Sequence, residues 1–135
     1  MPIKWEPSTM ATAIPTVDQQ HRQLIDWLND LLTAMSQGQG RTEVVAVLDK
    51  LDSYANTHFA FEEQCMVKYR CPVAETNMAA HAYFMKTFGD LRAEFEAGGV
   101  NSHLVLKVER ELAQWLASHI KGIDAKLAPC VRRAA

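Results

Sequence analysis

The fold is decided by residues 42–66, which read TEVVAVLDKLDSYANTHFAFEEQCM. Apolar or small residues recur there every three or four positions, which is the period of one face of an α-helix. The members of this stripe are Val44, Val47, Leu51, Ala55, His58, Glu62 and Cys65. The stripe predicts a long amphipathic helix with a histidine and a glutamate, one turn apart, on its core-facing side.

Three further stretches show the same helical period, at about residues 18–36, 73–97 and 101–128. We expect the helix of residues 42–66 to end before Pro72 and the last helix to end before Pro129, because proline disfavours helix at the preceding residue. The alternation of apolar and polar residues that marks strands is absent. Four helices with short links predict an all-α fold, an antiparallel up-down-up-down four-helix bundle.

The length of 135 residues predicts a single domain over residues 1–135. We expect an irregular N-terminal arm over residues 1–17, packed onto the bundle by Trp5, and a bundle over residues 18–127. The net charge of −2 and the lack of a basic run before Arg132 argue against nucleic acid as a partner. No long apolar window predicts a membrane span, and residues 1–6 do not resemble a signal peptide, so we expect a cytoplasmic protein.

The chain has three cysteines, Cys65, Cys71 and Cys130. Their odd number, and the lack of a secretory signal, predict reduced thiols. Cys65 and Cys71 are too far apart for a C-x-x-C pair, so a zinc or redox role is disfavoured. We interpret Cys65 as a small core residue and the other two as incidental thiols.

One histidine falls on the apolar stripe of each predicted helix: His21, His58, His81 and His119. A lone histidine on such a face is usually a hydrogen-bonded core residue. Four of them on four helices, together with Glu62 and Asp124, would be costly to bury unless they bound metal. The pattern therefore predicts a metal site, and we expect the fifth histidine, His103, to be solvated near a helix start.

The donor types indicate which metal this site would hold. Imidazole suits iron, copper, zinc and nickel, whereas carboxylate favours harder ions. Two carboxylates among four imidazoles suggest bridges between two irons. Di-iron oxidases and ferritin-like proteins use several glutamates and paired Glu-x-x-His motifs, and this chain has no Glu-x-x-His. A nitrogen-rich site of this kind favours binding dioxygen over consuming it.

Four segments of the chain resemble the hemerythrin family, specifically single-domain bacteriohemerythrins. They are Asp18 to His21, His58 to Met66, Pro72 with His81 to Phe84, and Trp115 to Asp124. The resemblance extends from Trp5 to about Leu127. It implies two iron ions with an oxo or hydroxo bridge and with dioxygen and small anions as ligands. It also implies a monomeric state, by analogy with small bacterial relatives.

The resemblance also implies a role for each ligand. Glu62 and Asp124 would bridge the irons, His21 and His58 would bind one iron, and His81 and His119 would bind the other. Dioxygen would be held reversibly as a hydroperoxide. His119 and Asp124 are five residues apart and would diverge by about 140° in an ideal helix. We therefore expect the helix end to loosen there through a π-type turn eased by Gly122.

The chain departs from the family pattern in the third helix. The family has His-x-x-x-His there, whereas this chain has Asn77 four residues before His81. Asn77 is a poor substitute for imidazole, and three readings stay open: weak ligation, a hydrogen bond to metal-bound water, or space filling. Without the fifth imidazole each iron would keep an open position, which predicts a more symmetric centre and weaker metal binding beside Asn77.

Apolar residues near the predicted ligands are expected to line a dry pocket for dioxygen, which would protect the bound ligand. They are Leu28, Phe59, Met66, Trp115 and Leu116. Ordinary core packing is the alternative for each of them.

Four classes of function follow from this pattern. The first is an oxygen carrier, store or delivery protein without enzymatic activity. The second is a di-iron oxidase, a peroxidase or an autoxidising variant that uses the position opened at Asn77. A sensor or iron-handling protein, and a purely structural bundle, are the remaining classes.

Overall fold

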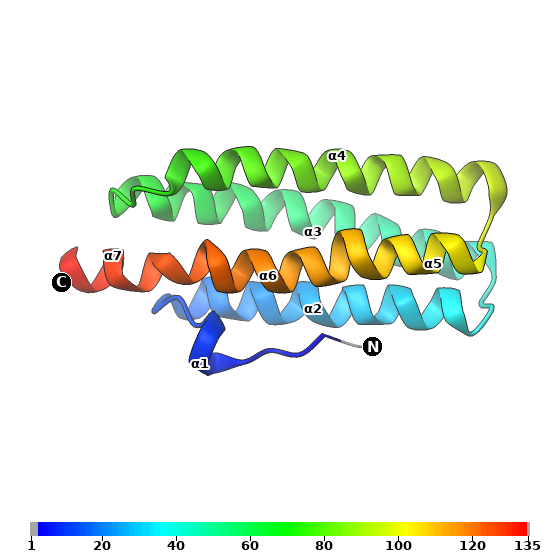
Figure 1. Ribbon diagram of the computed structural model, residues 1–135, viewed down its shortest axis with the longest axis horizontal. Helices are drawn as coiled ribbons and strands as arrows, with labels where there is room; N and C mark the ends of the chain where they lie inside the picture. The colour runs from blue at the N-terminus through cyan, green and yellow to red at the C-terminus, as the bar shows by residue number, and fades with distance from the viewer. Residues whose placement is uncertain (1–2, 135) are drawn as a thin grey trace.

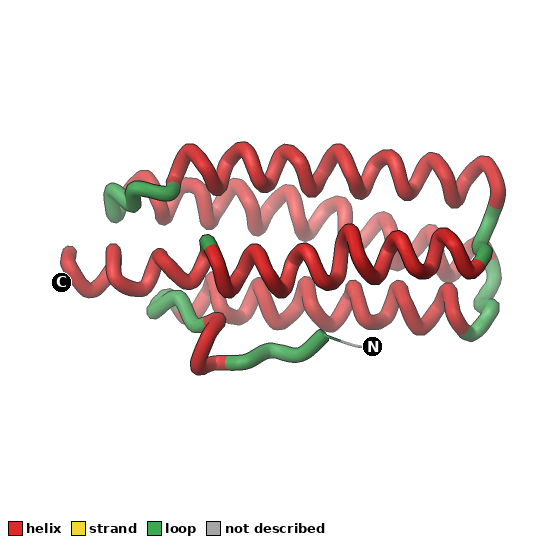
Figure 2. Tube along the Cα trace, viewed as in Figure 1, coloured by secondary structure: helices red, strands yellow, loops and turns green. Residues whose placement is uncertain are grey.

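A computed structural model describes residues 3–134 of the chain. Four long helical rods lie side by side and run in alternating directions, which confirms the predicted all-α four-helix bundle (Figures 1 and 2). The first three rods are α2 (Pro15–Ser36), α3 (Arg41–Lys68) and α4 (Ala74–Gly98). The fourth rod is continuous but consists of α5 (Ser102–Val108), the π-helical segment η1 (Glu109–Gln114) and α6 (Trp115–Gly122).

The predicted apolar stripes form the inside of the bundle. On α2 the side chains of Leu24, Leu28, Leu31 and Met35 are all buried, as the spacing of three and four residues requires. Phe84, Phe88, Leu91 and Phe95 of α4 pack into the same core cluster. Burial of these side chains supplies the main driving force that holds the four rods together.

The fourth rod differs from the other three in the spacing of its buried residues. Buried residues recur every four positions along it: Leu104, Val108, Leu112, Leu116 and Ile120. In a straight α-helix, side chains four residues apart drift by about 40° per step, so such a row would soon leave the core. The wider turn of the π-helical segment takes up this drift. Asn101 caps the start of the rod, because its side chain accepts a hydrogen bond from the Leu104 amide at 2.9 Å.

The C-terminal end does not stop before Pro129 as expected. A 3-10 turn, η2 (Asp124–Lys126), follows α6, and α7 (Leu127–Ala134) continues beyond it. Pro129 occupies the third position of α7. Proline is tolerated there because an amide in the first turn of a helix has no partner within the helix.

The prediction of three reduced thiols was wrong, because Cys71 and Cys130 form a disulfide. It joins the link between α3 and α4 to α7, across 59 residues of sequence. The prediction rested on the odd number of cysteines and the lack of a secretory signal, and neither feature reports which thiols the fold brings together. Cys65 is a buried free thiol and belongs to the small apolar cluster at this end of the bundle.

The N-terminal arm contains the short helix α1 (Pro7–Met10) and lies along the outside of the bundle (Figure 1). The Asn29 side chain of α2 both accepts from and donates to the backbone of Ile3, at 3.0 and 2.8 Å. Trp5 packs against the core cluster, as predicted. Within residues 3–134, no helix has the length and apolar character needed to cross a membrane.

Candidate metal centre

The six predicted ligands converge in the interior of the bundle, and all of them are buried. Two imidazoles from neighbouring rods approach one carboxylate. Nε2 of His21 lies 2.9 Å from Oε2 of Glu62, and Nε2 of His58 lies 3.7 Å from the same oxygen. Oδ2 of Asp124 completes this group at 3.1 Å from Nε2 of His21.

The other two imidazoles approach the opposite oxygens of the same two carboxylates. Nε2 of His81 lies 3.1 Å from Oε1 of Glu62, and Nε2 of His119 lies 3.1 Å from Oδ1 of Asp124. Within each group of four residues, the ligand atoms lie within 4.8 Å of one another. The arrangement therefore has two adjacent sets of donors that share Glu62 and Asp124.

The buried polar atoms of this cluster fit bound cations. Several lie close to an oppositely charged group but are not aligned for a hydrogen bond: Nε2 of His21, His58, His81 and His119, Oε2 of Glu62 and Oδ1 of Asp124. Buried polar atoms nearly always have a partner. Here their lone pairs converge in two places, so cations held at those places would satisfy them.

Two further side chains orient the imidazoles. Oε1 of Gln20 lies 2.7 Å from Nδ1 of His58, and Oε2 of Glu63 lies 2.8 Å from Nδ1 of His81. Such contacts direct the Nε2 lone pair of each ring inward. The sequence reasoning missed Gln20 and Glu63. The only available signal was that each one precedes or follows a predicted ligand in the chain.

The charges of the cluster shift its pKa values in opposite directions. Burial by itself lowers the pKa of His21, but the close carboxylates of Asp124 and Glu62 outweigh it and raise the pKa to about 9. Burial lowers the pKa of His58 to about 3. Burial also favours neutral carboxyl groups, yet the neighbouring imidazoles hold the pKa values of Glu62 and Asp124 below their ordinary range. Without metal, the cluster thus pairs anionic carboxylates with a protonated His21.

The backbone between His119 and Asp124 loosens, but not in the expected form. The helix ends at Gly122, Ile123 takes an irregular conformation with φ −118° and ψ −56°, and Asp124 begins the 3-10 turn. The changed backbone direction at Ile123 brings the Asp124 side chain to the same side of the rod as His119. The expected π-type turn lies upstream instead, at Glu109–Gln114.

Asn77 is fully buried beside the group that contains His81. Its Nδ2 donates hydrogen bonds to Oε1 of Glu62 at 2.9 Å and to Sδ of Met66 at 3.2 Å. Its Oδ1 has no hydrogen-bond partner among the described residues. The residue therefore touches the cluster through its amide nitrogen.

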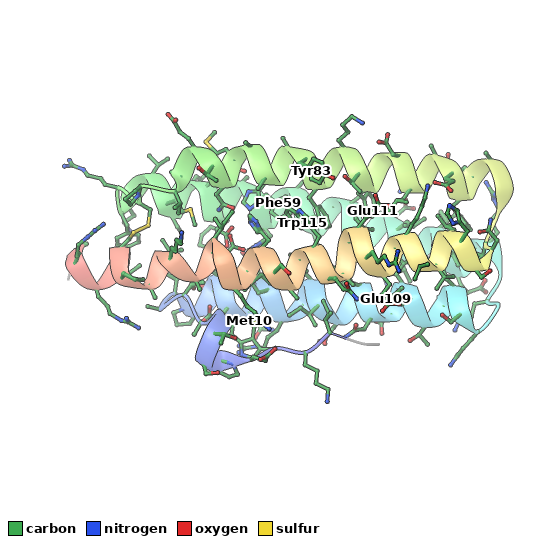
Figure 3. All side chains as sticks on the ribbon, viewed as in Figure 1. Met10, Phe59, Tyr83, Glu109, Glu111 and Trp115 are labelled. Atoms are coloured by element: carbon green, nitrogen blue, oxygen red, sulfur yellow. A yellow bond between two sulfur atoms is a disulfide. The ribbon has the colours of Figure 1, made fainter. Side chains whose placement is uncertain are left out.

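Two aromatic rings, one from α3 and one from the fourth rod, stack on imidazoles of the cluster, and Figure 3 labels both residues. Phe59 stacks on His81 with ring centroids 3.9 Å apart, and Trp115 stacks on His119 at 4.6 Å. Met66 contacts Asn77, while Leu28 and Leu116 are buried members of the main core. Their role as the lining of an oxygen pocket stays a prediction. His103 is exposed, as expected.

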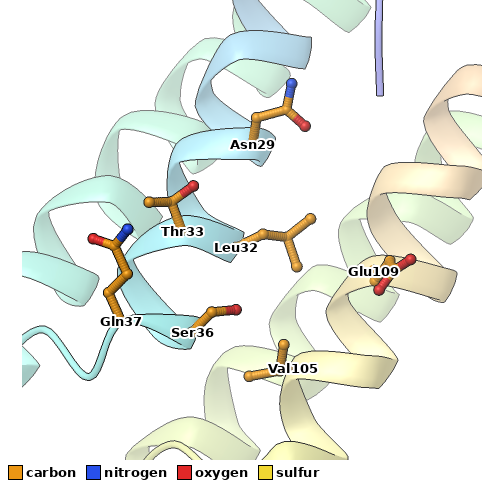
Figure 4. A pocket seen from close by; sticks show the side chains of 7 residues that line it. All are labelled: Asn29, Leu32, Thr33, Ser36, Gln37, Val105 and Glu109. Atoms are coloured by element: carbon orange, nitrogen blue, oxygen red, sulfur yellow. The ribbon is translucent and has the colours of Figure 1, made fainter. Parts of the chain in front are cut away.

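Two surface hollows differ in whether they reach the cluster of predicted ligands. One, of about 300 Å³, has Phe59, Glu63 and His81 among its lining residues and therefore reaches the edge of the cluster from α3 and α4. Another, of about 260 Å³, lies between α2 and the fourth rod, with Leu32 and Val105 across from each other (Figure 4). None of the six predicted ligands lines this second hollow.

The fold and the site together define a four-helix-bundle protein with a buried cluster of histidines and carboxylates that could hold metal ions. Residues 12–131 match the family model described as "Hemerythrin HHE cation binding domain". The chain therefore belongs to the hemerythrin family, which confirms the resemblance seen in the sequence. Members of this family are non-heme iron proteins that bind dioxygen.

Named relatives and a solved structure agree with this assignment. A bacteriohemerythrin of Stenotrophomonas maltophilia is 35% identical over 119 residues, which cover 88% of this chain and 75% of the relative. A bacteriohemerythrin of Methylococcus capsulatus is 28% identical over 96% of both chains. The crystal structure of a wild-type hemerythrin superposes with a TM-score of 0.82 at 28% identity, over 97% of this chain and 98% of that one.

Proposed function

We propose that this chain binds dioxygen reversibly at a centre of two iron ions. His21 and His58 hold one iron, His81 and His119 hold the other, and Glu62 and Asp124 bridge the two. The observation that carries this proposal is the orientation of Glu62 and Asp124. Each carboxylate turns one oxygen toward one pair of imidazoles and its other oxygen toward the second pair. A bridging carboxylate must present its two oxygens in this way.

The surroundings support binding rather than consumption of dioxygen. The two irons, when bound, supply the electrons that dioxygen accepts on binding. The chain contributes the ligands, keeps the centre dry and stacks Phe59 and Trp115 against two of the imidazoles. The hydroperoxide form, the oxo or hydroxo bridge, the monomeric state and the cytoplasmic location remain predictions.

A second candidate function is oxidase-like or peroxidase-like chemistry, and Asn77 is the observation that favours it. Relatives of the resembled type carry a histidine at this place, whereas here an amide contacts Glu62 through its nitrogen. An additional open position beside His81 and His119 would let small ligands reach both irons. Faster autoxidation and turnover of peroxide would then accompany oxygen binding.

The test is the visible spectrum of the iron-loaded, reduced protein through repeated addition and removal of dioxygen. Two irons per chain, and a charge-transfer band that appears and disappears over several cycles, are expected. A single irreversible conversion with turnover of peroxide would favour the second function. One iron per chain, or none, would contradict the two-iron centre.

A matched pair of histidine variants separates the centre from the rest of the chain. His58→Ala removes a buried ligand, whereas His103→Ala removes an exposed histidine on α5. We expect His58→Ala to lose bound iron and the oxygen-dependent band, and His103→Ala to keep both. Equal behaviour of the two variants would refute the assignment of His58.

A further inference from the structure

The carbonyl oxygen of Asn77 is a buried acceptor that no described residue satisfies. The side chain is fully buried, and Oδ1 has no hydrogen-bond partner. A buried carbonyl without a donor is costly, and native proteins rarely keep one. The feature therefore points to a donor that belongs to a bound ligand.

The orientation of the amide follows from its neighbours. Oε1 of Glu62 is a carboxylate acceptor, so the group that faces it at 2.9 Å must be the NH₂ of Asn77. Sδ of Met66, a weak acceptor, takes the other proton at 3.2 Å. Both protons of the amide are thus used within the protein, and Oδ1 must point away from both partners.

The two donor sets are otherwise equivalent. Each consists of two imidazoles and one oxygen from each of two carboxylates. Asn77 contacts Oε1 of Glu62, the oxygen that also faces His81, and so lies beside only one of the two sets. Asn77 therefore stands on the side of the centre that contains His81 and His119.

We propose that Oδ1 of Asn77 accepts a hydrogen bond from a small ligand with an O–H group, held beside His81 and His119. The ligand class is water, hydroxide or a protonated peroxide. Asn77 thereby selects protonated ligands over anions that carry no proton. This inference rests on the metal binding proposed above and deepens it, because it makes Asn77 a ligand-selecting residue.

The proposal differs from the two other roles open to this residue. A metal ligand would turn Oδ1 onto the ion, and a space filler would need no polar atoms. Leucine has a similar size and shape and would fill the same volume without a buried carbonyl. The use of both amide protons on Glu62 and Met66 keeps the carbonyl available for a ligand.

The first test is a high-resolution crystal structure of the zinc-loaded protein, which does not depend on oxygen chemistry. We expect an oxygen atom of a water or hydroxide about 2.5–3.0 Å from Oδ1 of Asn77. A direct bond between Oδ1 and zinc, or an Oδ1 with no partner, would overturn the proposal. Soaking such crystals with hydrogen peroxide distinguishes peroxide from water as the occupant.

The second test is azide titration of the cobalt-loaded protein, followed by its visible spectrum. Azide carries no proton and cannot replace the hydrogen bond that water donates to Asn77. We therefore expect Asn77→Leu to bind azide up to about tenfold more tightly than the parent, since one hydrogen bond is lost from the displaced water. Unchanged or weaker azide binding would contradict the proposal.

Gln64→Leu is the matched control, because it makes a similar substitution at an exposed amide of α3 outside both donor sets, and it should bind azide as the parent does. A general loosening of the centre in Asn77→Leu would weaken azide binding, whereas the loss of ligand selection strengthens it. If the variant does not fold, the structure of the unaltered zinc-loaded protein still decides the question. Failure to bind any metal would overturn the proposed function together with this inference, whereas metal binding without a partner for Oδ1 would overturn only the inference.

Discussion

Glu63 shows how a single partly exposed residue supports a buried site. Its carboxylate lies 2.8 Å from Nδ1 of His81, and its side chain is 26% exposed. It therefore connects a buried imidazole to the surface hollow between α3 and α4. A carboxylate in this position fixes the ring orientation and makes Nε2 a better donor to metal.

We expect Glu63→Ala to weaken metal binding about 10-fold to 100-fold, the usual cost of losing such a partner. Competition with a chromophoric zinc chelator measures this change. Glu63→Gln keeps a hydrogen-bonding group and should recover part of the affinity. Glu75→Ala, at an exposed acid of α4, is the control and should leave the affinity unchanged. An equal loss in both alanine variants would refute the role of Glu63.

At the scale of secondary structure, the segment from η1 to α7 places two of the six predicted ligands, His119 and Asp124. The π-helical segment keeps Leu112 and Leu116 on the core side, and it sets the rotation of α6 and therefore of His119. The break at Ile123 then turns the chain so that Asp124 faces the centre. The break at Ile123 is needed because a regular helix would separate His119 and Asp124 by about 140°.

The disulfide restrains the end of this segment. Cys130 on α7 is bonded to Cys71, six residues before Asn77 and beyond the end of α3. Sγ of Cys71 also contacts the backbone oxygen of Lys126 at 3.8 Å, within the turn that presents Asp124. The covalent link thus stabilises the part of the backbone that carries a predicted bridging ligand.

We expect Cys71→Ser to lower the free energy of unfolding by about 2–4 kcal/mol, because the unfolded chain loses a long-range constraint. Chemical denaturation followed by circular dichroism measures the change. A thiol reductant should destabilise the parent to a similar extent and should not affect the variant. Cys65→Ala is the control at the free thiol and should still respond to the reductant. Parent and variant of equal stability would contradict a stabilising role.

At the scale of the whole molecule, the bundle encloses a cluster whose charges are balanced only in part. Four imidazoles and two carboxylates are buried among apolar side chains from all four rods. Without metal, the pKa of His21 is raised to about 9, well above its ordinary value of 6.5. This proton stabilises the folded metal-free protein below pH 6.5, and the contribution is lost as the pH rises through 9.

Removal of metal should therefore lower the melting temperature, and more so at high pH. At a free zinc concentration 100 times Kd, binding adds about 2.7 kcal/mol to the stability of the folded state. Zinc must displace the His21 proton, so its stabilising effect should grow between pH 6.5 and 9. Calorimetry of zinc-loaded and metal-free protein across this range measures the effect. A stabilisation that shrinks as the pH rises would contradict this account of His21.

The sequence by itself determined the four rods, their order and the six residues that meet in the core. A helical period reports which side chains share a face, and His21, His58, His81 and His119 each lie on such a face. The sequence also showed that Asn77 stands where the resembled family has a histidine, because this departure concerns a single position of one motif. These features depend on spacing within one helix, and spacing is visible in the chain.

Only the tertiary structure decided how these faces are completed. The contacts of Gln20 and Glu63 with the imidazoles, and the unpartnered Oδ1 of Asn77, depend on how neighbouring rods are rotated against each other. The disulfide depends on α7, where we expected no helix because of Pro129. The π-helical segment keeps the buried residues of the whole fourth rod on the core side, and no single residue within the segment predicts where it lies. Contacts between distant segments arise from packing geometry, which the period of one helix does not contain.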